Sequence, residues 1–332
     1  MSFTDGLGRA VNYLRLSVTD RCNLRCAYCS RREQTEYIPH ENILRYEEML
    51  VIIRAVRGMG VNKVRLTGGE PFVRKDFLAF LGQLREEFPD LDLRITTNAT
   101  LLAGKAAALK LMGIKVMNIS LDTLDREKYQ RITGRDALPE VLGAVHECLD
   151  RGIKVKLNAV AIKGFNDEEL PAFLDLVRAL PVDLRFIEYM PMGGCLEWTE
   201  GKLWKADDIL AEASALAELT PLSPDAVDRG PSRIFAVAGG LGRLGLISPM
   251  SRHFCDSCNR LRVTADGRLR TCLFSDRTYK LLGYLRSSGF NDSGLVRIIR
   301  RAMASKPLGY KLVQERINGA AARDRAMSAI GG

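Results

Sequence analysis

The stretch VNYLRLSVTDRCNLRCAYC, residues 11–29, decides how the rest of the chain is interpreted. Its first eight residues are rich in apolar and β-branched side chains and predict a β-strand over 11–18. The strand leads into a short run that holds Cys22, Cys26 and Cys29. A tetrahedral metal site made by protein alone needs four donors, and this run supplies only three. The stretch therefore predicts a strand followed by a metal-binding loop, and leaves the fourth ligand open.

Further β-type runs alternate with amphipathic stretches such as NILRYEEMLVIIRAVRGMG (42–60) and DEELPAFLDLVRAL (167–180). Repeated strand–helix units predict a parallel sheet covered by helices, and right-handed crossovers would wind it into a barrel or partial barrel. We expect an α/β fold with a partial (βα)6 TIM-like barrel over residues 1–195 and a C-terminal domain over 196–332. The predicted strands are VNYLRLSV (11–18), NKVRLTG (62–68), DLRITTN (92–98), KVMNISLD (115–122), IKVKLNAVAI (153–162) and DLRFIEYM (183–190).

Every predicted strand ends in polar or glycine-containing residues. In a barrel of this kind the active-site groups lie at the C-terminal ends of the strands. The sequence therefore predicts one active site built from these ends. They are Thr19-Asp20, Gly68-Gly69-Glu70-Pro71, Thr96-Thr97-Asn98, Ser120-Leu121-Asp122, Lys163-Gly164 and Glu188-Tyr189-Met190.

Composition narrows the class of protein. The 332 residues are 46% hydrophobic and 27% charged, as in an ordinary globular protein. The N-terminus MSFTDGLGRA lacks a signal-peptide pattern, and no apolar run is long enough to span a bilayer. We therefore expect a cytoplasmic protein, and in that reducing compartment clustered cysteines more often bind metal or act in catalysis than form disulfides. The net charge of +9 suits nucleic acid, a membrane surface or an anionic small molecule.

A second cysteine cluster, Cys255, Cys258 and Cys272, again offers three thiols and not four. One alternative for the first cluster is a structural zinc site completed by a distant residue such as His40 or His146.

Other cysteines and polar residues carry weaker signals. Cys148 lies in the apolar helical run VLGAVHECLD and is predicted to be a buried small hydrophobe. His253 is expected to adjoin the second cluster or to be solvent-exposed, since three cysteines already supply that cluster's ligands. We assign no role to Cys195, Glu188 or Tyr189.

The run Gly240-Leu-Gly242-Arg-Leu-Gly245 fits G-x-G-x-x-G, which marks a dinucleotide site only where a helix begins. The residues RLGLIS that follow are typical of a strand. We therefore predict a hairpin turn at this position.

The C-x3-C-x2-C spacing after a first strand resembles the signature of the radical S-adenosylmethionine (SAM) superfamily. The resemblance implies that three thiolates hold three irons of a [4Fe–4S] cluster and that SAM chelates the fourth. Gly68-Gly69-Glu70-Pro71 resembles the family motif that contacts the SAM amino group, where glycine permits close approach. Ala99 stands where the family usually has Gly. The residues that this resemblance assigns to SAM are Tyr28, Gly69, Glu70, Thr96, Asn98, Ser120 and Met190.

Nearly the whole chain resembles the GTP 3′,8-cyclases, the first enzymes of molybdenum-cofactor (molybdopterin) biosynthesis. The second-cluster segment CDSCNRLRVTADGRLRTCLF (255–274) carries the more specific part of this resemblance. Ser30-Arg31 departs from the Met-Pro that is common in the family, so the loop after the first cluster is expected to differ. The other matching segments are RLSVTDRCNLRCAYC (15–29), RLTGGEP (65–71), SLD (120–122) and the terminal Gly331-Gly332.

This resemblance implies conversion of GTP to (8S)-3′,8-cyclo-7,8-dihydroguanosine 5′-triphosphate. A SAM-derived 5′-deoxyadenosyl radical removes the ribose 3′ hydrogen, and the carbon radical attacks C8 of the purine. The resemblance further implies that the second [4Fe–4S] cluster binds the guanine base and that the Gly-Gly tail reaches into the active site. Arg15, Arg260 and Arg262 would touch the substrate, the last two as catalytic residues. The residues implied for the triphosphate are Lys63, Arg65 and Lys156, which could instead form a solvated basic surface or pair with helix carboxylates.

The resemblance also implies an external electron donor and a separate cyclic pyranopterin monophosphate synthase that receives the product. A homodimer is possible, and no nucleic acid or membrane partner is expected. Two alternatives stay open: a peptide-modifying radical SAM enzyme with an auxiliary cluster, and a basic nucleic-acid-binding protein with two metal knuckles. Against the latter, residues 252–270 hold five arginines but only one aromatic residue, Phe254, for base stacking. The residues alone do not decide between GTP and ATP.

Overall fold

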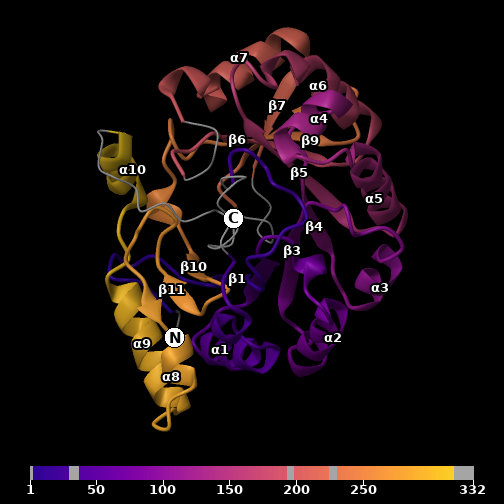
Figure 1. The fold of residues 1–332 in the computed structure, drawn as a ribbon. Helices are drawn as coiled ribbons and strands as arrows, with labels where there is room; N and C mark the ends of the chain where they lie inside the picture. The colour runs from indigo at the N-terminus through magenta and orange to yellow at the C-terminus, as the bar shows by residue number, and fades with distance from the viewer. Residues whose placement is uncertain (1–2, 30–36, 193–197, 224–229, 318–332) are drawn as a thin grey trace. The chain divides into compact units, whose positions relative to one another are not determined.

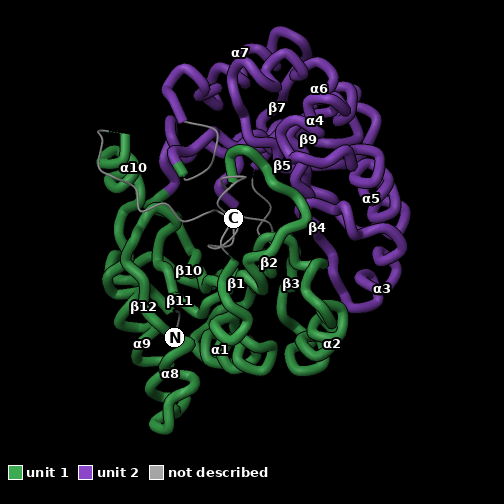
Figure 2. The backbone as a smooth tube through the Cα atoms, in the orientation of Figure 1, with its two compact units in different colours: residues 1–96, 192–195, 255–332 green, residues 97–191, 196–254 purple. Residues whose placement is uncertain are grey.

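The computed structural model describes residues 3–29, 37–192, 198–223 and 230–317, and the chain divides into two compact units (Figure 2). Unit 1 comprises residues 1–96, 192–195 and 255–332, and unit 2 comprises residues 97–191 and 196–254. This division concerns packing, and the domain boundary at residue 195 stays a prediction. Among the described residues, no helix has the length and apolarity that crossing a membrane requires.

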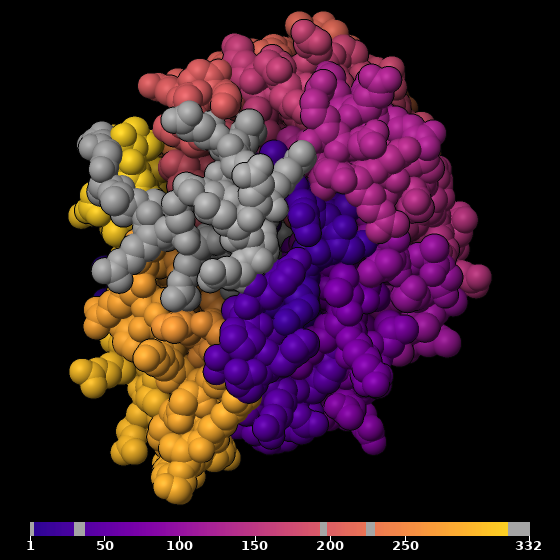
Figure 3. Space-filling view, viewed as in Figure 1, coloured from indigo at the N-terminus to yellow at the C-terminus, as the bar shows by residue number. Residues whose placement is uncertain are grey.

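The strands of unit 1 come from the N-terminal and C-terminal parts of the sequence. Their order is β12-β11-β10-β1-β2-β3. β1 pairs in parallel with β2 and with β10, while β10, β11 and β12 pair antiparallel. Figure 3 shows the result on the surface of unit 1, where early residues in indigo lie beside late residues in orange. The strands are β1 (Tyr13–Ser17), β2 (Lys63–Thr67), β3 (Asp92–Thr97), β10 (Arg260–Val263), β11 (Arg268–Arg270) and β12 (Tyr279–Lys280).

Each strand of unit 1 separates an apolar face from a polar one, because successive side chains point to opposite sides. Leu14 and Leu16 of β1 are completely buried, whereas Tyr13 and Arg15 lie on the other face. Helices α1 and α2 flank strands β1 to β3 in Figure 1. The helices are α1 (Tyr46–Gly58), α2 (Phe77–Glu87), α8 (Leu282–Leu285), α9 (Asp292–Ala304) and α10 (Gly309–Ile317).

The strands of unit 2 follow the order β4-β5-β6-β9-β8-β7. β4, β5, β6 and β9 run parallel, and β7 and β8 complete an antiparallel edge. The strands are β4 (Val116–Ser120), β5 (Lys154–Ala161), β6 (Asp183–Glu188), β7 (Leu219–Leu222), β8 (Arg233–Val237) and β9 (Arg243–Ile247). The helices are α3 (Ala106–Leu111), α4 (Arg126–Thr133), α5 (Leu138–Asp150), α6 (Leu170–Ala179) and α7 (Ala206–Leu216).

The structure confirms the six predicted strands as β1 to β6 and the two quoted helical stretches as α1 and α6. The predicted hairpin is also confirmed, because β8 and β9 pair antiparallel around the glycine-rich turn. Gly242 is needed there, since a Cβ would lie 2.4 Å from the Val182 carbonyl oxygen. Cys148 is completely buried in α5, as predicted, and burial raises the pKa of its thiol to about 12.

Glu188, at the end of β6, receives a structural role that the sequence did not indicate. Its side chain is 1% exposed. One carboxylate oxygen accepts a hydrogen bond from the Ala206 amide (2.9 Å), and the other accepts from the amides of Met250 (2.8 Å) and Ser251 (2.9 Å). The Ser251 hydroxyl also donates to this carboxylate. Glu188 therefore ties the end of β6 to the start of α7 and to the segment after β9.

Replacing Glu188 with Gln should destabilise unit 2. The amide nitrogen cannot accept a hydrogen bond, so at least one buried N–H loses its partner. We expect the free energy of unfolding to fall by about 2 kcal/mol, measured by chemical denaturation. Glu168→Gln, at an exposed position, is the control and should leave it unchanged. Equal stability of Glu188→Gln and the parent protein would contradict the assignment.

Candidate active site

The first cysteine loop follows β1 directly. Cys22, Cys26 and Cys29 are all half-buried in it. The Cys29 amide donates to the Cys26 carbonyl (2.9 Å), and the Leu24 amide donates to the Cys22 sulfur (3.4 Å). An N–H donated to sulfur favours the thiolate, which is the form that binds metal.

The Gly68-Gly69-Glu70 segment packs against the base of this loop. The Gly69 amide donates to the Thr19 carbonyl and the Glu70 amide to the Arg21 carbonyl, both at 2.8 Å. A Cβ on Gly69 would lie 2.2 Å from the Arg21 carbonyl oxygen. The sequence predicted that these glycines allow close approach of a ligand. The structure shows that they also allow close approach of the backbone at the start of the cysteine loop. The completely buried Glu70 accepts from the Phe72 amide at 3.1 Å.

The other residues that the resemblance assigns to SAM divide between the units. In unit 1, Tyr28 is half-buried beside the cysteines, and the Thr96 hydroxyl accepts from Arg65 at 3.3 Å. In unit 2, Ser120 is the last residue of β4, and Met190 lies half-buried just after β6. Thr96, Ser120 and Met190 thus lie at or just beyond a strand end, as predicted, whereas Tyr28 lies in the cysteine loop.

Asn98 and Ala99 form a tight turn after β3. The Asn98 side-chain oxygen accepts from the Thr100 amide at 3.1 Å. Ala99 has a φ of 62°, in the left-handed region that favours glycine. The departure from the family's usual Gly therefore falls where a side chain carries a conformational cost.

An arginine row crosses unit 1. In-register pairing sets Arg15 beside Arg262 on one side and Arg65 on the other. The same register continues from Arg262 to Arg270 and from Arg65 to Arg94. Residues paired in register point to the same face of a sheet. The arginine row is therefore Arg270, Arg262, Arg15, Arg65 and Arg94, on one face.

Lys63 and Arg260 lie on the same face as this row. Each is two residues before the arginine that its own strand contributes to the row. Tyr13 of β1 is in register with both. The cationic groups of Lys63 and Arg65 each lie 5.7 Å from the centre of the Tyr13 ring. The structure thus brings together the five cations that were predicted in unit 1, and it adds Tyr13 between them.

The row is electrostatically unfavourable in the protein alone. Burial, followed by the charge of Arg262, holds the pKa of Arg15 well below its ordinary value. Burial, followed by the charge of Arg260, lowers the pKa of Arg262 to about 10. Within the described part of the chain, the buried Nε atoms of Arg15 and Arg65 have no hydrogen-bond partner. Such groups are costly unless an acceptor binds them.

The predicted lysines differ from Arg15, because each pairs with a carboxylate. Lys63 lies 3.5 Å from Asp92. In unit 2, Lys156 is 4% exposed and lies 3.6 Å from Asp183, which also binds Arg243 at 2.7 Å. Both lysines therefore pair with a carboxylate, which comes from a strand and not from a helix as the alternative expected, and neither pair excludes a ligand.

The second cysteine loop immediately precedes β10. The Cys258 amide donates to the Cys255 carbonyl at 3.2 Å. Since Arg262 pairs with Arg270, the same antiparallel register brings Cys272 opposite the start of β10. A Cβ on Gly309, at the start of α10, would lie 2.8 Å from the Cys272 sulfur and 3.7 Å from the Cys255 sulfur. The three cysteines therefore share one site, and glycine leaves the space beside it.

Positive charge surrounds this second site. Burial opposes ionisation of Cys258, but the charges of Arg260 and Lys306 outweigh it and lower the pKa of the thiol. Burial raises the pKa of Cys272. The surrounding charges thus favour ionisation of Cys258 over Cys272, and bound iron would stabilise the thiolates of the site.

Both donor sets fit a [4Fe–4S] cluster with one open iron. Each set has three half-buried thiols, and a cubane binds each thiolate to a different iron. Among the described residues, no three His, Cys, Asp or Glu side chains are arranged to hold a single metal ion. Cys22, Cys26 and Cys29 would hold one cluster, and Cys255, Cys258 and Cys272 the other.

The remaining residues named in the sequence analysis are His253, Tyr189, Cys195, Ser30-Arg31 and the terminal Gly331-Gly332. His253 is exposed and its Nδ1 lies 2.9 Å from the Pro249 carbonyl oxygen, which agrees with its predicted place outside the ligand set. The buried Tyr189 accepts a hydrogen bond at its carbonyl from Trp198 (3.0 Å). Ser30-Arg31, Cys195 and Gly331-Gly332 lie outside the described residues.

Sequence reasoning missed Tyr13, Arg94, Arg9 and Lys306. A signal for Arg94 was present, because several strands repeat an arginine between two apolar residues, as in Leu14-Arg-Leu16 and Leu93-Arg-Ile95. Parallel pairing in register turns that repeat into a row. No comparable pattern indicates Arg9 or Lys306, which reach the site only through the fold.

Comparison with known proteins agrees with this geometry. The Radical SAM superfamily matches residues 16–177, and the family described as Molybdenum Cofactor Synthesis C matches residues 182–312. The solved structure of Streptococcus suis SuiB bound to S-adenosylmethionine has a TM-score of 0.62 at 16% identity, over 91% of this chain and 67% of that one. AdoMet-bound anSMEcpe has a TM-score of 0.59 at 15% identity, over 92% and 80%. The fold and the first cysteine loop thus define a radical SAM enzyme, and the predicted fold class is confirmed.

Curated relatives narrow that class. A GTP 3′,8-cyclase of Moorella thermoacetica is 41% identical over 99% of both chains. One of Syntrophomonas wolfei subsp. wolfei is 40% identical over 92% of this chain and 93% of the relative. The chain belongs to the GTP 3′,8-cyclase family.

Gly309→Ala should disrupt the second cluster selectively. The added methyl group would occupy the space beside the Cys272 sulfur. Anaerobically reconstituted protein should fall from about eight to about four irons per chain, as measured by iron analysis. Gly283→Ala is the control, because a Cβ there meets nothing within 4 Å. Full iron content in Gly309→Ala would show that the close approach to sulfur is unimportant.

Proposed function

We propose that this chain converts GTP to (8S)-3′,8-cyclo-7,8-dihydroguanosine 5′-triphosphate in molybdenum-cofactor biosynthesis. Family membership and the two three-cysteine sites support this activity. Bound SAM and the first [4Fe–4S] cluster supply the 5′-deoxyadenosyl radical. The protein's own residues must then bind the nucleotide, hold its ribose in place and exclude competing targets.

The arginine row carries the proposal. Like charges have been gathered on one buried face, and the Nε atoms of Arg15 and Arg65 lack partners within the described residues. A triphosphate supplies several negative charges and many acceptor oxygens, and arginine binds such oxygens through a rigid fork of donors. The unfavourable field of the free protein therefore becomes favourable when the nucleotide binds.

We assign the triphosphate to Lys63, Arg65 and Lys156. Arg15, Arg260 and Arg262 then contact the nucleotide, with Arg260 and Arg262 as the catalytic pair. Both follow Cys258 within four positions, so one short strand presents the second cluster and these two cations together. Tyr13 offers its ring between Lys63 and Arg260.

We assign SAM to the strand ends around the first cysteine loop. The proposed contacts are Tyr28, Gly69, Glu70, Thr96, Asn98, Ser120 and Met190. We further propose that the Gly331-Gly332 tail enters the active site, that an external donor supplies the electron and that a cyclic pyranopterin monophosphate synthase consumes the product. We also propose a cytoplasmic location and a homodimer. The six clustered cysteines must stay reduced, which supports the cytoplasmic location.

Anaerobic turnover of the reconstituted protein tests the function. SAM and a strong reductant are supplied with GTP, with ATP or with no nucleotide, and 5′-deoxyadenosine and nucleotide are followed by chromatography. We expect 5′-deoxyadenosine that depends on GTP, with matching GTP loss. SAM cleavage that ignores the nucleotide would sink the cyclase assignment and favour a peptide substrate.

Arg15→Met should weaken nucleotide binding without weakening the fold. Loss of charge-assisted hydrogen bonds should raise the Kd for GTP by about tenfold or more, measured by equilibrium dialysis. The variant should unfold no earlier than the parent, because it removes a buried cation from beside Arg262. Arg301→Met, at an exposed position of α9, should change neither quantity. A destabilised variant that binds GTP normally would assign Arg15 to structure.

A further inference from the structure

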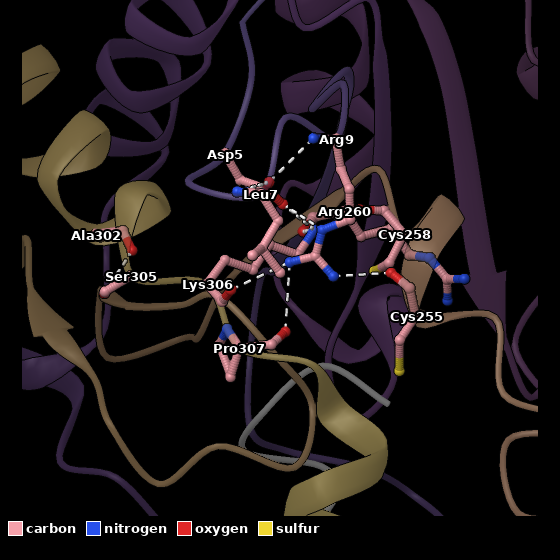
Figure 4. Close-up of polar contacts among 10 residues, drawn as sticks. All are labelled: Asp5, Leu7, Arg9, Cys255, Cys258, Arg260, Ala302, Ser305, Lys306 and Pro307. Atoms are coloured by element: carbon pink, nitrogen blue, oxygen red, sulfur yellow. Dashed lines mark hydrogen bonds and ion pairs between the residues drawn. The ribbon is translucent and has the colours of Figure 1, made fainter.

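Three buried charged side chains lie next to the backbone of the second cysteine loop and have no part in the proposed reaction (Figure 4). Asp5, Arg9 and Lys306 are 7%, 8% and 3% exposed. The first two come from the loop before β1, and Lys306 lies between α9 and α10. Charges this deeply buried are tolerated only when they are paired and hydrogen-bonded.

Lys306 bonds to the backbone on both sides of Asn259. Its ammonium donates to the Cys258 carbonyl at 2.6 Å and to the Arg260 carbonyl at 2.9 Å (Figure 4). One of these residues is a proposed iron ligand and the other a proposed substrate contact. A single cation therefore holds the backbone of both.

Arg9 holds the other half of the loop. Its guanidinium donates to the Cys255 carbonyl at 2.8 Å and to the Lys306 carbonyl at 3.1 Å. It also donates through Nε to Asp5 at 2.6 Å. These bonds use the fixed fork of arginine donors, which a lysine could not reproduce.

Asp5 balances both cations. Its carboxylate lies 2.6 Å from Arg9 and 3.9 Å from Lys306. The adjacent Gly6 packs against the end of α9, where its amide donates to the Met303 carbonyl at 3.3 Å. The C-terminal end of a helix favours positive charge, which suits the position of Lys306 and Arg9.

We propose that Asp5, Arg9 and Lys306 form a clamp whose role is to position Cys255, Cys258 and Arg260 relative to one another. These three are positioning residues, because they act only through the backbone of the loop. The clamp makes loading of the second cluster and binding of the nucleotide depend on the same contacts. Its effect on GTP rests on the proposed role of Arg260, whereas its effect on the cluster does not.

A brace that merely held the chain ends together would lower thermal stability and nothing else. A clamp must also change properties of the folded protein at low temperature. Those properties are the iron content, the electron paramagnetic resonance signal of the second cluster and the Kd for GTP.

Lys306→Met tests the clamp in the full-length chain, reconstituted anaerobically and checked for folding by circular dichroism. We expect iron to fall from about eight toward about four per chain and the second-cluster signal to be lost. The Kd for GTP should rise by about tenfold or more, while SAM binding and the first-cluster signal are retained. Lys311→Met, at an exposed position of the neighbouring helix, should match the parent. Parent-like iron, signal and GTP affinity in Lys306→Met would overturn the proposal.

Hydrogen exchange gives a second test, which leaves Asp5, Arg9 and Lys306 unaltered. It therefore still tests the proposal in the event that Lys306→Met fails to fold. Coupling between two sites is reciprocal. A Cys255→Ala, Cys258→Ala, Cys272→Ala variant should therefore exchange faster at residues 3–11 and 303–309 than the loaded parent, with α1 unchanged. Unchanged exchange in those two segments would refute the clamp. If the parent itself binds no GTP, the proposed function fails, and iron content and exchange still judge the clamp.

Discussion

The pairing of β10 with β1 is the constraint on which the rest of unit 1 depends. β1 leads into the first cysteine loop, and β10 leaves the second one. Because the two strands are parallel and in register, Arg15 and Arg262 lie side by side. One backbone pairing therefore sets the positions of both metal-binding loops and of the cations associated with them in unit 1.

That pairing also concentrates charge in a way that folding alone would disfavour. Burial and a neighbouring arginine lower the pKa of these groups: burial, then Arg262, acts on Arg15, and burial, then Arg260, acts on Arg262. The apolar faces of the same strands, with Leu14 and Leu16 completely buried, offset this cost. The protein thus retains a local instability at the place where an anionic nucleotide would remove it, which is a common compromise between stability and function.

Much of this organisation was predictable from the sequence. The six β-type runs became β1 to β6, because local side-chain pattern and parallel pairing agree. The cysteine spacing and the glycines at 68 and 69 marked the first loop. Strands β11 and β12 were not predicted, since they are only three and two residues long. Arg9 and Lys306 were missed because an isolated cation leaves no periodic pattern in the sequence, and only tertiary structure shows which carbonyls it meets.

The β1–β10 pairing has a consequence for synthesis on the ribosome. The Arg9 side chain bonds to Cys255, 246 residues later. At about 5–20 residues per second, β1 emerges roughly ten seconds or more before β10 exists. During that interval one hydrogen-bonding edge of β1 is open, next to the three thiols of the first cysteine loop. An open edge invites pairing with another chain. The nascent enzyme therefore passes through a window in which aggregation and premature oxidation compete with completion of its sheet.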